Sequence, residues 1–147
     1  MIGQNGLEIL DDGECVHLLH SARVGRVGVN IGGAPAVLPV NYVMVGSDIM
    51  FFTGEGLKMN AALRADTVTF EVDEVDVDEQ TGWSVLALGV ASNADHEDHA
   101  RVESLGLYPW AAGERNHLVR IRPSFLSGRR ILTGHETGHE AGHETTI

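Results

Sequence analysis

The chain has 147 residues, a formal net charge of −11 at pH 7 and one cysteine. This length suits a single domain that buries one hydrophobic core. The excess of acidic residues disfavours nucleic acid as a partner, because a polyanion would be repelled over most of the surface. Cys15 cannot form an internal disulfide, and the apolar-periodic stretch around it predicts a buried, structural thiol.

No sequence feature points to a membrane or to export. The apolar runs fall short of the about 18 residues that a membrane-spanning helix needs. The N-terminal stretch MIGQNGLEILDDGE lacks the basic and hydrophobic regions of a signal peptide. We therefore expect a cytoplasmic protein without a membrane partner.

The first predicted element is a short helix. Asp11 and Glu14 have the spacing of a helix start that resembles a capping box. An apolar stripe over residues 15–19 follows, and the helix is expected to end near Ser21.

Three strands are predicted next. RVGRVGVNI, residues 23–31, alternates as a strand does, and GGAP then has the composition of a turn. AVLPVNYVMV, residues 36–45, is apolar on both faces, which is typical of a strand in a barrel wall. DIMFFT, residues 48–53, is expected to pair back across Gly46-Ser47 as a hairpin.

A second helix is predicted from Leu57 to about Ala65, and it begins with a lysine. The N-terminus of a helix carries a partial positive charge and unsatisfied N–H groups, so Lys58 is poorly placed unless an anion binds beside it. The alternative is a solvated lysine tolerated there at a cost of ~0.3–1 kcal/mol.

TVTFEVDEVDVDE, residues 67–79, is predicted to be a strand with an irregularity. Its first apolar residues share one face, whereas Val75 and Val77 have the opposite parity. A bulge near Asp73-Glu74 would return both valines to the inner face.

The last elements are two strands around a helix. WSVLALGVAS, residues 83–92, is a strand that is apolar on both sides. ADHEDHARVESLGL, residues 94–107, is a surface helix that ends at Gly106 and exposes His96, His99 and Glu103. In the final strand, HLVRIRPSFLSGRRI, Val119 and Ile121 are expected to point inward, and Arg120 and Arg122 share the other face.

These elements amount to about six strands with two or three helices. Hairpin-connected strands without a polar face predict a small, mostly antiparallel β-barrel with peripheral helices. The order does not alternate strand and helix, so a Rossmann sheet is disfavoured. The barrel domain spans residues 1–131, and residues 132–147 form a tail.

Four segments carry a family resemblance: ECVHLLHSARVGRVGV, PAVLPVNYVMVGSDIMFFTGEGLKMNAA, FEVDEVDVDEQTGWSVLALGVA and VRIRPSFLSGRRI. In this order and spacing they resemble the pyridoxamine 5′-phosphate oxidase-like flavin-binding split barrels, especially the short branch that includes nitroimidazole-resistance proteins. The resemblance runs from about Leu7 to Ile131. It implies a mostly β, six-stranded antiparallel split barrel and a homodimer that holds flavin mononucleotide (FMN), or a deazaflavin, between its subunits.

The resemblance also implies which residues contact the cofactor: Val40, Asn41, Tyr42, Phe52, Thr53, Lys58, Trp83, Ser84 and Trp110. Lys58 and Thr53 would meet the phosphate, assisted by backbone N–H groups of GEGLK. Residues 40–42 would run along the flavin ring, and Trp110 would reach the site from the other subunit. Without the resemblance, the aromatic residues among these would be interpreted as barrel core.

The implied function is a flavin-dependent oxidoreductase that transfers hydride or electrons to a small-molecule acceptor. Gly-x-Ser-x-Gly, His-Glu-x-x-His and Walker-type patterns are all missing. A flavin carries the chemistry itself, so no catalytic triad is required. The alternatives are a deazaflavin-dependent reductase and a non-catalytic flavin or haem carrier or sensor. For a deazaflavin tail, the candidate basic groove is Arg23, Arg26, Arg120, Arg122, Arg129 and Arg130.

The tail repeats every four residues as GHETGHEAGHET. Its glycines and its lack of an apolar face predict disorder. The regular spacing of His135, His139 and His143 leaves a weak site for a divalent transition metal as the alternative.

Overall fold

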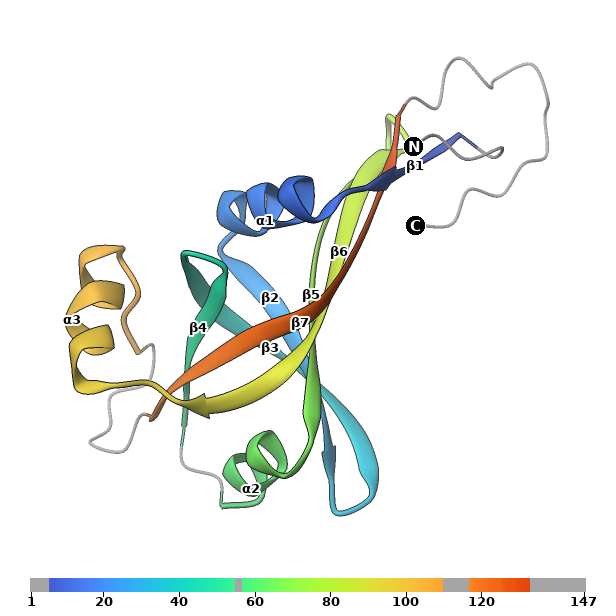
Figure 1. The fold of residues 1–147 in the computed structure, drawn as a ribbon. Coiled ribbons are helices and arrows are strands. Elements are labelled where there is room, and N and C mark those ends of the chain that lie inside the picture. The colour runs from blue at the N-terminus through green and yellow to red at the C-terminus, as the bar shows by residue number, and fades with distance from the viewer. Residues whose placement is uncertain (1–5, 55–56, 110–116, 133–147) are drawn as a thin grey trace.

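The computed structural model describes residues 6–54, 57–109 and 117–132, apart from the side chains of residues 57–59 and 65. This part of the chain forms seven strands and three helices, drawn in Figure 1. In chain order they are β1 (Leu7–Leu10), α1 (Asp12–Ser21), β2 (Val24–Ile31), β3 (Ala34–Val45), β4 (Asp48–Thr53), α2 (Leu57–Ala65), β5 (Thr67–Asp76), β6 (Thr81–Asn93), α3 (His96–Ser104) and β7 (His117–Ile131).

Six of the strands close into a ring. They follow the order β7-β4-β3-β2-β5-β6, every neighbouring pair is antiparallel, and β6 pairs with β7 to complete the circle. Closure satisfies the backbone of strands that would otherwise be edges. The structure therefore confirms the predicted mostly β, six-stranded antiparallel split barrel with peripheral helices.

The seventh strand, β1, was not predicted. Its four residues, LEIL, pair with the end of β7 from Leu7↔Ile131 to Leu10↔Gly128. A strand this short has no recognisable alternation. It forms because β7 continues past Ile121, the last residue that pairs with β4, and so has a free edge opposite β6.

The barrel interior holds the main core, and aromatic rings fill its centre. Tyr42, Phe51 and Phe70 are fully buried, and the Tyr42 and Phe70 rings meet edge to face with centroids 4.9 Å apart. The Tyr42 hydroxyl donates to the Leu19 carbonyl of α1 at 2.5 Å. This bond ties the helix that covers one end of the barrel to the wall beneath it.

The sole thiol lies under the same helix. Cys15 is fully buried, as predicted, and its Sγ fills the space beside Gly128 of β7: a Cβ built on that glycine would lie 2.6 Å from the sulfur. Burial raises the pKa of the thiol, and the nearby carboxylates Asp12, Asp11 and Glu14 raise it further. The thiol is therefore protonated and shielded.

A second, smaller core lies outside the ring. It consists of Val43, Met50, Val102, Leu107 and Leu118, which join α3 to the outer face of β3, β4 and β7. Arg120 of β7 fixes the same contact, because its Nη2 donates to Asp98 Oδ1 of α3 at 2.7 Å and its Nη1 lies 3.5 Å from Asp48 Oδ2. Helix α3 is thereby held against the barrel wall.

Most local predictions for the helices and the last strand are confirmed. Asp11 caps α1 by accepting from the Glu14 N–H at 2.8 Å, and α2 has the predicted bounds. Gly106 has a φ of 86° after α3, where a side chain would be strained. Val119 and Ile121 point inward, and His96, His99 and Glu103 are exposed.

The predicted bulge near Asp73-Glu74 is wrong. The β5–β6 register runs without interruption from Thr67↔Val90 to Asp76↔Thr81, and Val75 and Val77 are 49% and 80% exposed. The alternation simply continues past the end of the core. A register shift does occur between Leu88 and Gly89, in the pairing of β6 with β7.

Replacing Tyr42 by phenylalanine should lower the free energy of unfolding by about 1–2 kcal/mol, because the buried Leu19 carbonyl loses its donor. Urea denaturation would measure the change. Tyr108→Phe, at a ring that is 54% exposed, is the matched control and should change stability by less than about 0.5 kcal/mol. Equal effects of the two variants would contradict the role assigned to the Tyr42 hydroxyl.

Candidate functional site

The predicted ring-contact residues of β3 and β4 divide between the two faces of the barrel wall. Val40 packs against the main core, and Tyr42 is fully buried there, so the Tyr42 side chain is not available to a ligand. The pair Tyr42↔Phe51 places Asn41 beside Phe52, and alternation directs both of these residues outward. Phe52 packs against the second, smaller core beneath α3, which we call the α3 core, and its ring centroid is 6.1 Å from that of His99.

Thr53 and the start of α2 form the second part of the candidate site. Thr53 ends β4, is 8% exposed and donates from Oγ1 to Asn60 Oδ1 at 3.4 Å. Helix α2 begins at Leu57 without an acidic residue in its first turn, which leaves its N-terminus suited to an anion. Lys58 lies in that turn, and its side chain lies outside the described part of the structure.

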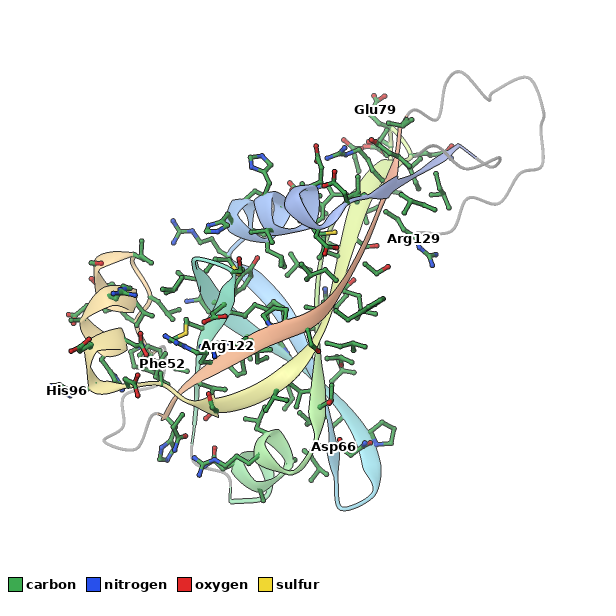
Figure 2. All side chains as sticks on the ribbon, in the orientation of Figure 1. Phe52, Asp66, Glu79, His96, Arg122 and Arg129 are labelled. Atoms are coloured by element: carbon green, nitrogen blue, oxygen red, sulfur yellow. The ribbon has the colours of Figure 1, made fainter. Side chains whose placement is uncertain are left out.

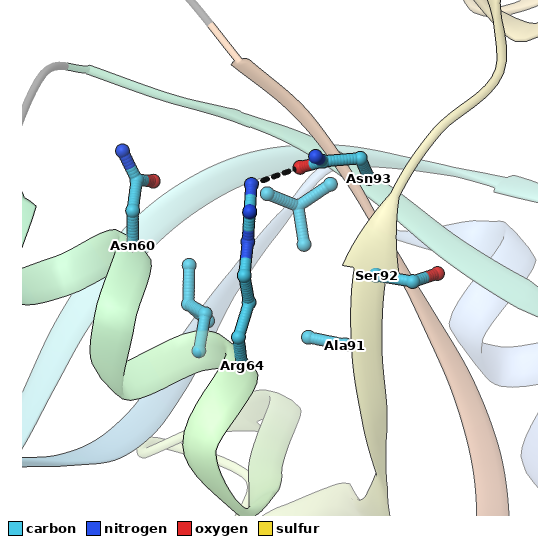
Figure 3. A pocket seen from close by; sticks show the side chains of 7 residues that line it. Asn60, Arg64, Ala91, Ser92 and Asn93 are labelled. Carbon is cyan, nitrogen blue, oxygen red and sulfur yellow. Dashed lines mark hydrogen bonds between the residues drawn. The ribbon is translucent and has the colours of Figure 1, made fainter.

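A shallow depression adjoins this helix, seen close by in Figure 3. It lies between α2 and the ends of β6 and β7, and the space that it encloses is only about 10 Å³. Its lining residues are Asn60, Leu63, Arg64, Ala91, Ser92, Asn93 and Val119. Among these, Arg64 alone is charged, and it donates to Asn93 Oδ1. That space holds about one water molecule, so the depression suits at most one small polar group at its mouth.

The sequence had not singled out Asn60, Arg64 or Asn93. The available signal was the four-residue spacing of Asn60 and Arg64, which places both side chains on one face of α2. The third member comes from the distant strand β6, so only the fold brings it to the helix.

Trp83 and Ser84 lie at the other end of the barrel. They pair with Arg130 and Arg129 near the end of β7, whereas Asn93 at the depression pairs with Val119 near its start. At ~3.3 Å per residue, Ser84 and Asn93 are separated by roughly 30 Å of strand. In Figure 2, Phe52 lies near α3 and Arg129 lies toward the opposite end of the ribbon. One FMN cannot span the two groups within one protomer.

The last predicted contact, Trp110, lies outside the described residues, as do the tail histidines His135, His139 and His143. Across the described ranges, no cluster of three or more metal-ligating side chains occurs. The helices resolved in those ranges are also too short or too polar to cross a bilayer.

Most of the arginines predicted to form a basic groove make ion pairs with carboxylates. Arg26 pairs with Glu71 and Asp73, Arg120 with Asp48 and Asp98, Arg122 with Asp48, and Arg130 with Glu8 and Glu14. These pairs lie on different parts of the barrel. They stabilise the contacts between elements and do not form a single groove.

An apolar strip crosses the outer face of five strands. Register places its members side by side; we call Val37, Gly28, Thr69, Leu88 and Phe125 the outer row. Val37 and Phe125 are 67% and 52% exposed. Two residues further along β2 and β5, on the same face, Arg26 pairs with Glu71. Arg26 Nη1 also lies 3.0 Å from Asp73 Oδ2, and the three side chains form an ion-pair cluster.

The charge on this cluster depends on pH in the neutral range. Burial and then the hydrogen bond and charge of Asp73 raise the pKa of Glu71 to about 7, although Arg26 acts in the opposite direction. Two carboxylates that face one guanidinium compete for it, so one of them keeps its proton more readily. The surface beside the outer row is therefore less negative at pH 6 than at pH 8.

Comparison with known proteins identifies the family. The model of the pyridoxamine 5′-phosphate oxidase family matches residues 11–130. The chain belongs to this family. The sequence is also similar to Rv0080, an uncharacterized protein of Mycobacterium tuberculosis. The two are 34% identical over 134 residues, which cover 87% of this chain and 88% of Rv0080.

Two solved structures are similar to this chain. A FAD-binding protein from Mycobacterium smegmatis is 37% identical with a TM-score of 0.74, and the match covers 84% of this chain and 98% of that one. A proposed 5-nitroimidazole antibiotic resistance protein from Bacteroides thetaiotaomicron shares the fold, with 15% identity, a TM-score of 0.64 and coverage of 85% and 89%. The resemblance inferred from the sequence is thereby confirmed.

The raised pKa of Glu71 has a measurable effect on stability. The folded chain holds this proton more tightly than the unfolded chain, so Glu71 favours folding below about pH 4.5 and this contribution is lost as the pH rises through about 7. Glu71→Gln should therefore flatten the pH dependence of the unfolding free energy between pH 5 and 8. Denaturant titrations at a series of pH values and one protein concentration would measure the unfolding free energy. Glu74→Gln, at an exposed neighbouring position, is the control. If Glu71→Gln left the pH dependence of the unfolding free energy unchanged, the raised pKa of Glu71 would be contradicted.

Proposed function

We propose that this chain binds a flavin nucleotide and acts as an oxidoreductase that passes hydride or electrons to a small-molecule acceptor. The observation that carries the proposal is membership of the pyridoxamine 5′-phosphate oxidase family together with 37% identity to a FAD-binding protein over 98% of that protein. FMN is the cofactor predicted from the sequence, and the name of this relative adds FAD as a second candidate.

The residues near α2 fit the phosphate of such a cofactor. The helix N-terminus presents backbone N–H groups, its first turn has no carboxylate, and the Thr53 hydroxyl ends the strand that leads to it. In this proposal Lys58 neutralises the phosphate charge. Asn41, with an amide that both donates and accepts, would hydrogen-bond the edge of the ring from the outer face of β3.

When bound, a flavin supplies the hydride or electron transfer itself. The chain then has to bind the cofactor, orient it and exclude water from it. Phe52 and the α3 core beside it provide an apolar wall next to Asn41 for this purpose. A purely carrier role would use the same residues, and reduction of bound flavin by NAD(P)H with reoxidation by an acceptor distinguishes the two.

We also propose that two copies of the chain form the complete site. Thr53 and Trp83 lie too far apart to contact one flavin from the same protomer, so a homodimer would bring them together from different subunits. The outer row supplies exposed apolar side chains on the sheet face between these two ends. Stable protein interfaces bury ~1,600 Å² and have apolar centres of this kind.

A deazaflavin in the same place remains the alternative cofactor. Its long anionic tail requires a groove of unpaired cations, whereas four of the six arginines considered for it face carboxylates. The structure therefore gives FMN or FAD better support.

Lys58→Ala should weaken binding of FMN and of FAD by about 1–3 kcal/mol, because a charged hydrogen bond to phosphate is lost. Titration of cofactor-stripped protein, followed by flavin fluorescence, would measure the two affinities, and a parallel titration would test the deazaflavin. Lys58→Arg should recover most of the affinity. If Lys58→Ala bound both flavins like the wild type, the phosphate role would be excluded; if the wild-type protein bound none of the three cofactors, the proposed function would fail.

Phe125→Asp should convert the dimer to a monomer at micromolar concentration, because an ionised carboxylate would enter the apolar row. Analytical ultracentrifugation would measure the mass, and circular dichroism would confirm that the barrel is still folded. Val77→Asp adds the same charge on a residue that is 80% exposed and outside the row, and it should leave the dimer intact. A dimeric Phe125→Asp variant would place the interface elsewhere.

A further inference from the structure

We propose that the depression beside α2 binds the second phosphate of a dinucleotide flavin, and that Arg64 selects FAD over FMN. This inference rests on the proposed function, because it extends the phosphate site at the start of α2. It assigns a role to side chains that the phosphate site itself does not use.

The depression directly continues the proposed phosphate site. Asn60 belongs to both, because its Oδ1 accepts from Thr53 Oγ1 and its side chain also lines the depression. Arg64 follows one helical turn later on the same face of α2, ~6 Å further along the axis. In Figure 3 the side chains of Asn60, Arg64 and Asn93 reach toward the same side of the depression. A group attached to the first phosphate would therefore meet Arg64 next.

The donors in the depression match a phosphate. A guanidinium has five N–H donors, and the Arg64 side chain uses Nη2 to contact Asn93 Oδ1. The remaining donors form a fork that can bind two phosphate oxygens at once. The amides of Asn60 and Asn93 offer further donors, whereas the Ser92 hydroxyl points away from Arg64 in Figure 3. None of the lining residues is a carboxylate, although the chain as a whole is strongly acidic.

This environment distinguishes Arg64 from the arginines in ion pairs elsewhere on the barrel. Arg26, Arg120 and Arg130 each lie within 4 Å of carboxylate oxygens, which neutralise them. The contact that holds Arg64 is a neutral amide oxygen. Its positive charge is therefore oriented by a hydrogen bond and still available to an anion.

The floor of the depression is apolar and fixed. Leu63, Ala91 and Val119 are 2%, 6% and 5% exposed and belong to the main core. They hold α2 against the ends of β6 and β7, so the polar side chains above them keep their spacing. The depression encloses space for about one water molecule, so a phosphate would sit at its open mouth and a whole adenosine would lie outside it. For this reason the proposal concerns the second phosphate alone.

The test is a pair of titrations, with FMN and with FAD, of the cofactor-stripped wild-type protein and of Arg64→Gln. Flavin fluorescence reports the dissociation constants and does not require turnover. We expect the wild type to bind FAD more tightly than FMN. Arg64→Gln should weaken FAD binding about 10- to 100-fold and change FMN binding less than about threefold.

Two further variants control for general effects. Arg101→Gln removes the same charge from an exposed position on α3 and should alter neither affinity by more than about threefold. Arg64→Lys keeps the charge without the fork and should recover part of the FAD affinity. Thermal melting of each variant without flavin checks that the fold is intact, which is expected because Arg64 is exposed.

The outcomes separate this inference from the proposed function. Equal losses of FMN and FAD affinity in Arg64→Gln, no loss of either, or a wild type that prefers FMN would overturn the role of Arg64 and leave flavin binding standing. A selective loss of deazaflavin binding, with FAD unaffected, would assign Arg64 to a carboxylate tail and would also overturn it. A wild type that binds none of the three would refute both proposals.

Discussion

β7 pairs with three other strands, and the position of every other element depends on this pairing. Its first residues pair with β4, its last residues pair with β1, and β6 follows it along nearly its whole length. Its pairing with β6 shifts register between Leu88 and Gly89. At that point a Cβ on Gly89 would lie 2.3 Å from the Arg122 carbonyl oxygen, so only glycine allows the backbones to approach this closely.

The closed ring explains why the candidate site is divided. Thr53 lies beside the start of β7 and Ser84 beside its end, so the same strand that closes the barrel also separates them. A single protomer therefore presents two partial sites at opposite ends. Apolar side chains cross the sheet face between those ends, with an ion-pair cluster beside them, and the proposed dimer uses this face.

Local sequence patterns were sufficient for much of the fold. Capping at Asp11, the hairpin at Gly46-Ser47 and the bounds of α2 follow from interactions within a few residues, and the structure agrees with each. β1 and the exposed Val75 could not be predicted in this way. The first depends on a distant strand edge, and the second depends on where the core stops, which the alternation of the strand does not indicate.

The candidate site was harder to predict from the sequence, because it too depends on contacts between distant segments. The lysine at the start of α2 is an anomaly of charge within one helix and is visible in the sequence, whereas the partnership of Arg64 with Asn93 joins α2 to β6. Tyr42 illustrates the opposite difficulty. An aromatic residue in a strand is equally compatible with ligand contact and with packing, and only its burial and its bond to Leu19 assign its side chain to the core.

The buried thiol beneath α1 can report how often this helix moves away from the barrel. Because the Cys15 sulfur fills the space over Gly128 and the pKa of the thiol is raised, a thiol-reactive probe would reach it only when the helix lifts from β7. The chain contains no other cysteine, so the rate of labelling would have a single source. The labelling rate of the native Cys15 would therefore measure, without an engineered tag, how often α1 uncovers this end of the barrel.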